Sequence, residues 1–384
     1  MGERSDIVYL DYAAATPMSD GVLKAMAPFA QSIFYNPSAL YSGARDAKSA
    51  LEQARARVAR TIGARPSEII FTAGGTESAN LAIHGVMSAF PEGELVVSAI
   101  EHDAVLKPAQ ARNARIIGVD AAGRVQLEAL KQAITDSTVL ISIMYANNEV
   151  GTVQPIDEVV GLVAEERARR RVSGNTMPLY VHTDACQAPL YLDINIARLG
   201  VDLMTLNGGK LFGPKQSGIL FHKTGVRIEP HIRGGGQEYG LRSGTENVGA
   251  CVGFAQALSD AVEQRAEAVA KVRKLADMLR TSLETVDKTC IFNGHPRLRL
   301  PNTVHVTFPG HDNERMLFSL DDQGVFAAAG SACSASNDEP SHVLRAMGVS
   351  DEDARASLRF SMSSRTTEQE IKRAVKSLAI ALKA

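Results

Sequence analysis

The segment TVLISIMYANNEVG, residues 138–151, decides the fold class, because its unbroken apolar run stops abruptly at polar residues. The run is short and contains β-branched Val and Ile, which is typical of a strand buried on both faces of a parallel sheet. Further runs of the same kind lie in EIIFTAGGTES (68–78), ELVVSAIEHD (94–103), LYVHTDACQA (179–188), DLMTLNGGK (202–210) and GILFH (218–222). Helical patterns alternate with these runs, so residues 68–222 are predicted to form a doubly wound α/β domain with a mostly parallel sheet.

Helices are predicted on both sides of this region. Before it, apolar residues repeat at helical spacing and end at Gly63, a natural C-cap. These residues are Ala47, Leu51, Ala54, Val58 and Ile62. After it, residues 249–286 contain no proline and predict one long helix that connects the sheet to a compact α+β region. That region is predicted to contain strands at TVHVTF (303–308) and LRFSM (358–362), and helices at 313–324 and 366–384.

Composition limits the classes of function. The 384 residues include 41 basic and 43 acidic side chains, a formal net charge of -2, so nothing predicts a nucleic-acid or membrane partner. Residues 1–20 are charged and lack an apolar run of signal-peptide length, which predicts a cytoplasmic protein. Four widely spaced cysteines without a C-x-x-C pair, and nine histidines without ligand spacing, predict no metal site. The basic run RARRR (167–171) is predicted to be the solvated end of a helix.

Polar residues follow five of the predicted strands, where open α/β sheets bind ligands. They lie at 72–77, at His102, at 147–149, at 184–187 and at 207–210. The AGGTES turn could hold a phosphate at a helix N-terminus or only cap that helix, and Asp184 could pair with a cation or cap the next helix. Lys210 lies among glycines that leave room for a bound group. A lysine, a phosphate cup and a carboxylate are together the parts of a pyridoxal 5'-phosphate site.

Nine segments resemble the cysteine desulfurases of the class V aminotransferase group, above all the bacterial housekeeping and nitrogen-fixation type. In order from about residue 8 to residue 380, they are LDYAAATP, YNPSALYSGARDAK, FTAGGTESANLAI, EHDAVL, YANNEVGTVQPI, VHTDACQA, GGKLFGPKQSGIL, GGGQEYGLRSGTEN and GSACSASNDEPSHVLRAMG. The resemblance implies a homodimer with the aspartate aminotransferase-like fold of pyridoxal phosphate-dependent transferases. It implies a large domain at 15–255 around a mostly parallel seven-stranded sheet. A small α+β domain would comprise 1–14 and 256–384 and carry a mobile cysteine loop at about 326–340.

The same resemblance implies the roles of individual residues. Lys210 would bind the cofactor as a Schiff base, Asp184 would keep the pyridine nitrogen protonated, and the catalytic His102 would stack on the ring. The remaining cofactor contacts implied are Gln187 at the phenolic oxygen, Gly75, Thr76, Asn207 and Gly209 around the phosphate, Asn147, and Thr245 reaching across from the other subunit. The residues implied for the substrate L-cysteine are Asn36, Asn147 and Arg359. For Arg359 alone, a strand-edge arginine paired with a nearby acid would be the simpler interpretation.

Cys333 lies in a run of small and polar residues, AAGSACSASNDEPS, which suits an exposed and mobile nucleophile. The resemblance places the persulfide-carrying cysteine here. The thiolate would take the sulfur of L-cysteine, leave L-alanine, and pass the sulfur to an acceptor such as an iron-sulfur scaffold, a tRNA thiolation relay or a cofactor-synthesis protein. Cys186, Cys251 and Cys290 lie in strand-like or helical contexts and are predicted to be core residues.

One motif departs from the family, which usually has Ser-Gly-His-Lys where this chain has Asn207, Gly208, Gly209 and Lys210. An imidazole and a hydroxyl that contact the cofactor phosphate are replaced by an amide and a bare backbone. Loss of one charge-assisted contact costs on the order of 1.5 to 3 kcal/mol, which predicts weaker cofactor retention. Three alternatives stay open: a selenocysteine lyase, a small-amino-acid aminotransferase, or a weakly active scaffold for sulfur transfer.

Overall fold

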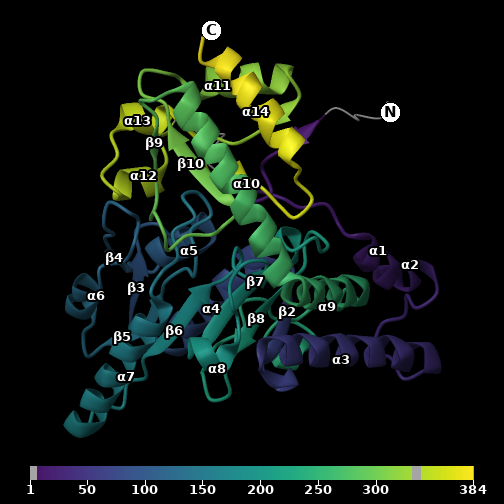
Figure 1. The fold of residues 1–384 in the computed structure, drawn as a ribbon. Coiled ribbons are helices and arrows are strands. Elements are labelled where there is room, and N and C mark those ends of the chain that lie inside the picture. Colours follow the sequence, from purple (N-terminus) through teal and green to yellow (C-terminus); the bar gives the residue numbers. More distant parts are fainter. Residues whose placement is uncertain (1–6, 331–338, 384) are drawn as a thin grey trace.

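A computed structural model describes residues 7–330 and 339–383 of the chain. Its centre is a seven-stranded sheet with strand order β2-β8-β7-β6-β5-β3-β4 (Figure 1). The strands are β2 (Ile69–Thr72), β3 (Glu94–Ser98), β4 (Arg115–Ile117), β5 (Thr138–Ser142), β6 (Tyr180–Asp184), β7 (Leu203–Asn207) and β8 (Gly218–His222). Only β8 runs in the direction opposite to the other six strands, so the mostly parallel seven-stranded sheet is confirmed.

The six predicted apolar runs are all strands, and both faces of the sheet are buried. Ile69 and Phe71 belong to the core on one face, whereas Ile70 between them belongs to the core on the other. This alternation explains why the runs are continuously apolar. The strand that the sequence did not reveal is β4, an edge strand whose Arg115 and Ile116 are exposed, so it lacks an apolar run.

Helices cover the two faces of the sheet. One face carries α4 (Gly75–Ala89) and α5 (Asp103–Gln110). The other carries α3 (Ser42–Ile62), α7 (Ile156–Ser173) and α9 (Val248–Glu263). Shorter helices are α1 (Asp20–Met26), α2 (Pro28–Gln31), α6 (Leu127–Ala133) and α8 (Ile196–Leu199), with 3-10 turns η1 (Pro66–Glu68), η2 (Gly208–Lys210) and η3 (Glu238–Gly240). The predicted helix before the sheet is α3, which ends at left-handed Gly63 as expected.

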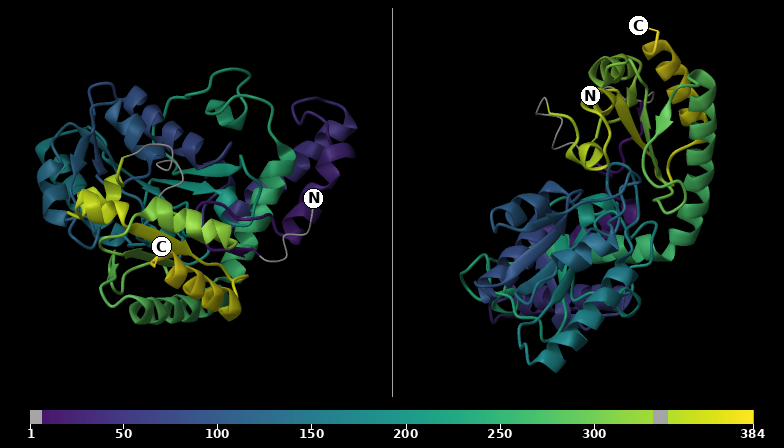
Figure 2. Two further views of the ribbon diagram at one scale, coloured as in Figure 1. Left: turned by 90° about the horizontal axis from the view of Figure 1, so that it is seen from above. Right: turned by 90° about the vertical axis from the view of Figure 1, so that its left-hand side faces the viewer.

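A second, smaller part has its own sheet and core (Figure 2). Its antiparallel sheet has the order β12-β10-β9, and β1 pairs in parallel with β11. These elements are β1 (Val8–Tyr9), β9 (Ile291–Phe292), β10 (Thr303–Thr307), β11 (Val325–Phe326) and β12 (Ser357–Ser361), with α10 (Arg265–Val286), α11 (Asn313–Asp322), α12 (His342–Ala346), α13 (Asp351–Arg355) and α14 (Glu368–Ala381). Val8 and Leu10 share this core with residues 275–381. This division agrees with the assignment of the first residues to the smaller part, whereas Ala257 and Leu258 of α9 still belong to the core of the large sheet. The predicted domain boundaries stay a prediction.

The single helix predicted at 249–286 is wrong, because α9 and α10 are separate helices that meet at Gln264. The two helices serve different cores: α9 packs on α1 and α3 beside the large sheet, and α10 packs on α14 and β10. A straight helix could not present its apolar side to both cores, so the chain turns between them. Figure 1 shows the change of direction.

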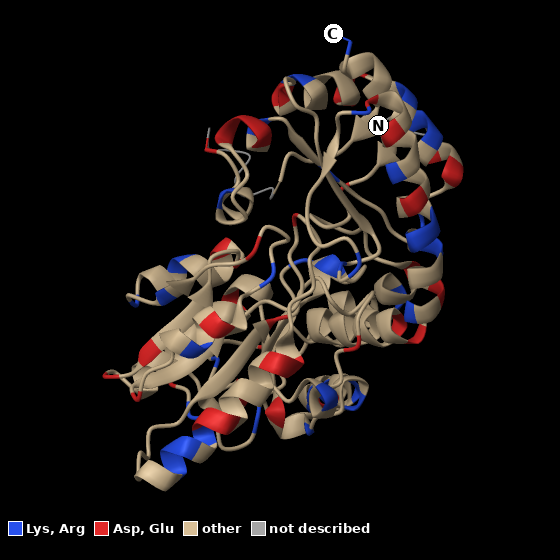
Figure 3. Cartoon of the chain, turned by 60° about the vertical axis from the view of Figure 1, so that its left-hand side comes forward, with Lys and Arg blue, Asp and Glu red and all other residues tan. Residues whose placement is uncertain are grey.

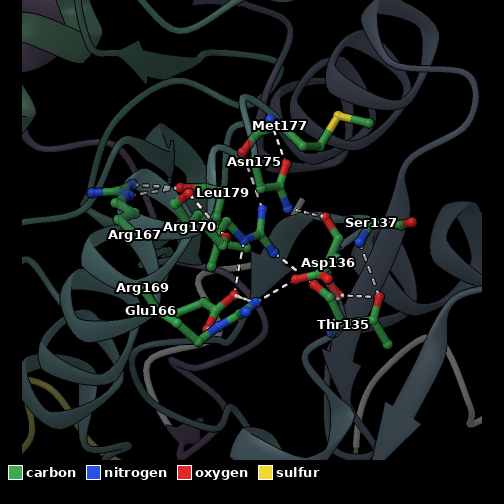
Figure 4. A network of polar contacts seen from close by, with 12 residues as sticks. Thr135, Asp136, Ser137, Glu166, Arg167, Arg169, Arg170, Asn175, Met177 and Leu179 are labelled. Atoms are coloured by element: carbon green, nitrogen blue, oxygen red, sulfur yellow. Dashed lines mark hydrogen bonds and ion pairs between the residues drawn. The ribbon is translucent and has the colours of Figure 1, made fainter.

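The basic run at 167–171 ends α7 as predicted, but it is not simply solvated. Arg170 is 2% exposed, and its guanidinium donates to the carbonyl oxygens of Thr135 at 2.7 Å and of Met177 and Pro178 at 3.2 Å (Figure 4). Arg170 Nε also donates to Glu166 at 2.9 Å. Arg170 thus ties the end of α7 to two neighbouring loops, which a helical pattern of charges cannot reveal.

Figure 3 shows acidic and basic residues interspersed along the outer helices. Among the described residues, no helix is long and apolar enough to cross a membrane. No group of three or more His, Cys, Asp or Glu side chains within residues 7–330 and 339–383 is arranged to hold a metal ion.

Candidate active site

The predicted strand-end residues converge on one open cavity of about 620 Å³. Parallel strands end at the same edge of a sheet, so residues far apart in sequence meet there. The sequence-predicted residues that line the cavity are Gly75, Thr76, His102, Asp184, Gln187, Asn207, Lys210 and Arg359. Asn148 and Cys186, from the predicted strand-end ranges 147–149 and 184–187, also line it. Residues that the sequence did not single out complete the lining: Ala13, Ala14, Ala104, Met144 and Ala146.

Lys210 ends the turn η2, directly after β7. Its Nζ donates to the carbonyl oxygen of Ala14 at 2.6 Å. The two glycines before it differ in purpose. A Cβ at Gly208 would lie 2.2 Å from Ser217 Oγ, so the close approach of the chain requires glycine there. A Cβ at Gly209 would meet nothing closer than Asn207 Oδ1 at 3.5 Å, so that position has room for a Cβ.

The turn before α4 forms a cup at a helix N-terminus. Gly74 has φ +119°, which favours glycine, and α4 begins at Gly75. The first N–H groups of a helix have no partner within that helix and attract anions. A Cβ at Gly75 would lie 2.8 Å from Cys186 Sγ and 3.3 Å from Asn207 Cβ, so the turn is packed tightly on both residues. The side chain of Asn207 lies against the cup and accepts the N–H of Gly209 at 3.0 Å.

The ring-facing candidates are fixed by local hydrogen bonds. Asp184, the last residue of β6, is 8% exposed and accepts the N–H of Cys186 at 2.9 Å. Gln187 Nε2 donates to the carbonyl oxygen of Ala13 at 3.0 Å. His102 caps α5, and its Nδ1 accepts the N–H of Ala104 at 3.0 Å. The imidazole therefore has a defined orientation at the edge of the cavity.

Glu101 is a buried carboxyl group beside the site that sequence reasoning missed. Its Oε1 accepts the Ser98 hydroxyl at 2.5 Å and the N–H of Met144 at 2.8 Å. Its Oε2 has no hydrogen-bond partner within the described residues. Burial, and to a smaller extent the charge of Asp184, raises the pKa of Glu101 to about 8, although its hydrogen bonds act in the opposite direction. The available signal was a carboxylate three residues after the end of the buried strand β3.

Arg359 reaches the cavity from β12 and is 1% exposed. One guanidinium nitrogen donates to the carbonyl oxygen of Asn148 at 3.0 Å, and another forms an ion pair with Asp11 at 2.5 Å. Its Nε has no partner among the residues that the structure describes. This arginine therefore pairs with an acid and also lines the cavity, and its role in binding the substrate stays a prediction. The pairing was not visible in sequence because 348 positions separate the two residues.

Asn147 does not line the cavity. Its Nδ2 donates to the carbonyl oxygen of Ile100 at 3.1 Å, and its Oδ1 accepts the N–H groups of Glu149 and Val150. The side chain is thus used to hold the turn after β5. The next residue, Asn148, faces the cavity in its place. Sequence alone could not distinguish adjacent asparagines in a turn, because the direction of each side chain depends on the local backbone.

Three other predicted residues lie elsewhere or outside the described structure. Asn36 is exposed, and its Oδ1 accepts the N–H of Ser38. Thr245 lines a different cavity, together with Ala73 and Arg242. Cys333 lies outside the described residues.

The other cysteines differ from the prediction in one case. Cys251 is buried in α9, and Cys290 is partly buried beside the smaller core. Cys186 lines the cavity, so it is not only a core residue. Burial, with the nearby Asp184 carboxylate, raises the pKa of the Cys186 thiol well above its usual value. This thiol stays protonated and is a poor nucleophile.

These residues fit pyridoxal 5'-phosphate, which needs an amine, a partner for the ring nitrogen and an anion site. Lys210, Asp184 and the cup at Gly75 and Thr76 provide these groups around one cavity. Gly75 keeps the cup free of side-chain atoms.

Comparison with known proteins gives the same family over most of the chain. Residues 8–374 match the aminotransferase class-V family. A cysteine desulfurase IscS of Methanosarcina thermophila is 41% identical over 373 residues, covering 95% of this chain and 89% of that protein. A solved NifS-like protein has a TM-score of 0.89 at 34% identity, covering 98% of this chain and 99% of that one. A structure of SspA in complex with cysteine has a TM-score of 0.77 at 34% identity, covering 94% and 99%. This chain belongs to the aminotransferase class-V family.

Proposed function

We propose that this protein is a pyridoxal 5'-phosphate-dependent cysteine desulfurase that converts L-cysteine to L-alanine and transfers the sulfur to Cys333. The observation that carries the proposal is that Lys210, Asp184 and Arg359 line the same cavity beside a helix N-terminus. A relative is named as a cysteine desulfurase, and a structure of the same fold holds cysteine.

The residues around the cavity divide the work of holding the cofactor. Bound pyridoxal phosphate supplies an electron sink for the carbanion that forms when an amino acid loses its Cα proton. Lys210 would hold the cofactor aldehyde, and Asp184 would keep the ring nitrogen protonated. His102 and Gln187 would contact the ring and its phenolic oxygen. The phosphate contacts proposed are Gly75, Thr76, Asn207, the backbone at Gly209 and, from a partner subunit, Thr245.

The chain's own groups would also handle the substrate and its proton. The Arg359 guanidinium would bind the substrate carboxylate, because a planar fork of donors matches a carboxylate and its Nε needs a partner. The Lys210 amine would take the Cα proton. The Cys333 thiolate would then attack the substrate sulfur, so that an S–S bond forms while the Cβ–S bond breaks. The electron pair left on Cβ would take up a proton, and the Cα proton would return from Lys210, which gives alanine.

Partner and location are further parts of this proposal. The persulfide would pass to a sulfur-acceptor protein, such as an iron-sulfur scaffold or a sulfur relay protein. Thr245 lines a second cavity and not the one that holds Lys210, which supports a homodimer in which Thr245 serves the partner. The substrate roles of Asn36 and Asn147, the mobile loop at about 326–340 and the cytoplasmic location stay predictions.

Alanine and sulfide formation from L-cysteine tests the proposal, with reductant and added cofactor, in the unaltered protein and in Cys333→Ala. We expect both products from the unaltered protein and neither from the variant, although both bind the cofactor. Equal turnover of the two proteins would exclude Cys333 as the sulfur carrier. Bound cofactor without turnover in either protein would favour the scaffold alternative. The same assay with L-selenocysteine distinguishes a cysteine desulfurase from a selenocysteine lyase, because a selenocysteine lyase would act on L-selenocysteine and not on L-cysteine.

A further inference from the structure

Side chains, and not another strand, complete the outer edge of β2. This strand lies at the end of the large sheet, where backbone groups would otherwise be unpaired. The carbonyl oxygen of Ile69 accepts from Arg55 at 2.8 Å, and the N–H of Phe71 donates to Glu238 at 2.8 Å. Two residues further on, the N–H of Ala73 donates to Glu77 at 2.9 Å. Side chains thus form hydrogen bonds with the backbone of every second residue, from Ile69 to Ala73 in the turn before the phosphate cup.

Arg55 and Glu238 form a buried ion pair that fixes this edge. Two nitrogens of Arg55 each lie 2.7 Å from an oxygen of Glu238, and both side chains are at most 3% exposed. The guanidinium also stacks between the rings of Phe71 and Tyr239, 5.0 and 5.1 Å from their centroids. Glu238 and Tyr239 have φ of 47° and 59°, which non-glycine residues keep only where their surroundings enforce it. The ion pair therefore sets the course of the segment that leads to Arg242.

Arg242 continues the network to the cup itself. Its Nε donates to Glu77 Oε1 at 2.7 Å and a terminal nitrogen to Oε2 at 3.3 Å, with both side chains largely buried. Glu77 directly follows Gly75 and Thr76 in the first turn of α4. A carboxylate there suits an empty helix N-terminus, but it repels a second anion bound at the same place. A phosphate group in the cup therefore requires the charge of Glu77 to be balanced.

We propose that Arg242 is a positioning residue for cofactor phosphate: it neutralises Glu77 and holds its carboxylate on the N–H of Ala73. This inference rests on the proposed assignment of Gly75 and Thr76 to the phosphate. The buried Arg55–Glu238 pair fixes the segment that positions Arg242 beside Glu77. Thr245 follows on the same segment and lines the same second cavity as Arg242 and Ala73. The same segment therefore positions both Arg242 beside the cup and Thr245 in the second cavity.

Binding titrations of the apoprotein test this proposal, since they do not depend on turnover. Pyridoxal 5'-phosphate and pyridoxal, which lacks the phosphate, would each be titrated into the unaltered protein and into Arg242→Met. We expect the Kd for pyridoxal phosphate to rise at least tenfold and that for pyridoxal less than threefold. Adding Glu77→Gln to Arg242→Met should restore most of the affinity, because the amide still accepts from Ala73 but carries no charge. A loss that is equal for both ligands, or not restored by Glu77→Gln, would overturn the proposal.

Two further variants keep the result interpretable. If Arg242→Met does not fold, Arg242→Lys can replace it, because lysine retains the charge but not the two-pronged contact with Glu77. We expect Arg242→Lys to bind pyridoxal phosphate three- to tenfold more weakly, with the melting temperature of the apoprotein unchanged. An unchanged affinity would overturn the proposal. Thr76→Val tests the phosphate assignment itself. A loss of affinity in Thr76→Val without one in Arg242→Met would overturn only the role of Arg242. No loss in either variant would overturn both this inference and the phosphate assignment on which it rests.

Discussion

Gly209→His should strengthen cofactor binding, because it would return an imidazole to the position where the family usually has one. The structure accommodates the first atom of the new side chain: a Cβ at 209 would lie 3.5 Å from Asn207 Oδ1 and 3.9 Å from Lys215 Cγ, both ordinary contacts. Gly209 also does not adopt positive φ, so a side chain adds no backbone strain. Its carbonyl oxygen is held by the N–H and hydroxyl of Thr16, each at 3.1 Å, which keeps the turn in place.

The expected magnitude follows from one charge-assisted hydrogen bond, which contributes about 1.5 to 3 kcal/mol. This corresponds to a Kd for pyridoxal 5'-phosphate lower by roughly 10- to 150-fold. This Kd would be measured by equilibrium titration of the apoprotein, with the absorbance of the bound cofactor as the signal. The gain should be larger at pH 6 than at pH 8, because an imidazole with a pKa near 6.5 is mostly charged only at the lower value.

Two controls separate the imidazole from the added Cβ. Gly209→Ala should leave the Kd within about twofold, since it adds no donor. Gly208→Ala should lower the melting temperature, because its Cβ would lie 2.2 Å from Ser217 Oγ. An unchanged Kd in Gly209→His, with unchanged melting of the apoprotein, would refute the reasoning. The amide of Asn207 and the bare backbone would then already replace the missing contact.

Three further changes test the site. Arg359→Lys should raise KM for L-cysteine about 10- to 100-fold with a smaller change in kcat, because a point charge cannot keep Asp11 and a substrate carboxylate together; a change confined to kcat would contradict this. The melting temperature of the unaltered protein should fall as the pH rises from about 5 to 8, and Glu101→Gln should remove this decline. The same pH profile in both proteins would count against this role of Glu101. Burial raises the pKa of Glu101 from 4.5 to about 8, so the folded chain keeps a proton that the unfolded chain releases, at a cost of at most about 5 kcal/mol. Gly75→Ala should weaken cofactor binding at least tenfold, because its Cβ would lie 2.8 Å from Cys186 Sγ; adding Cys186→Ala should restore part of that loss, and no recovery would exclude this contact as the cause.

Residues that end strands were the most predictable part of the site. Lys210, Asp184 and Asn207 follow apolar runs whose length and composition identify buried strands, and parallel strands bring their carboxyl ends together. The family resemblance added Arg359, which a strand pattern alone would assign to an edge ion pair. The exposed strand β4 and the break at Gln264 escaped prediction because neither leaves a change in local apolar periodicity.

By itself, the sequence determined six of the seven strands of the large sheet, helix α3, and the lysine, carboxylate and glycine turn of the candidate site, because local periodicity and strand ends encode them. Only the tertiary structure decided which of two adjacent asparagines faces the cavity, since a turn sets that direction. It also paired Arg55 with Glu238 across 183 positions and Arg359 with Asp11 across 348. Buried charges find their partners through the packing of whole elements, and this packing has no signature within a short stretch of chain.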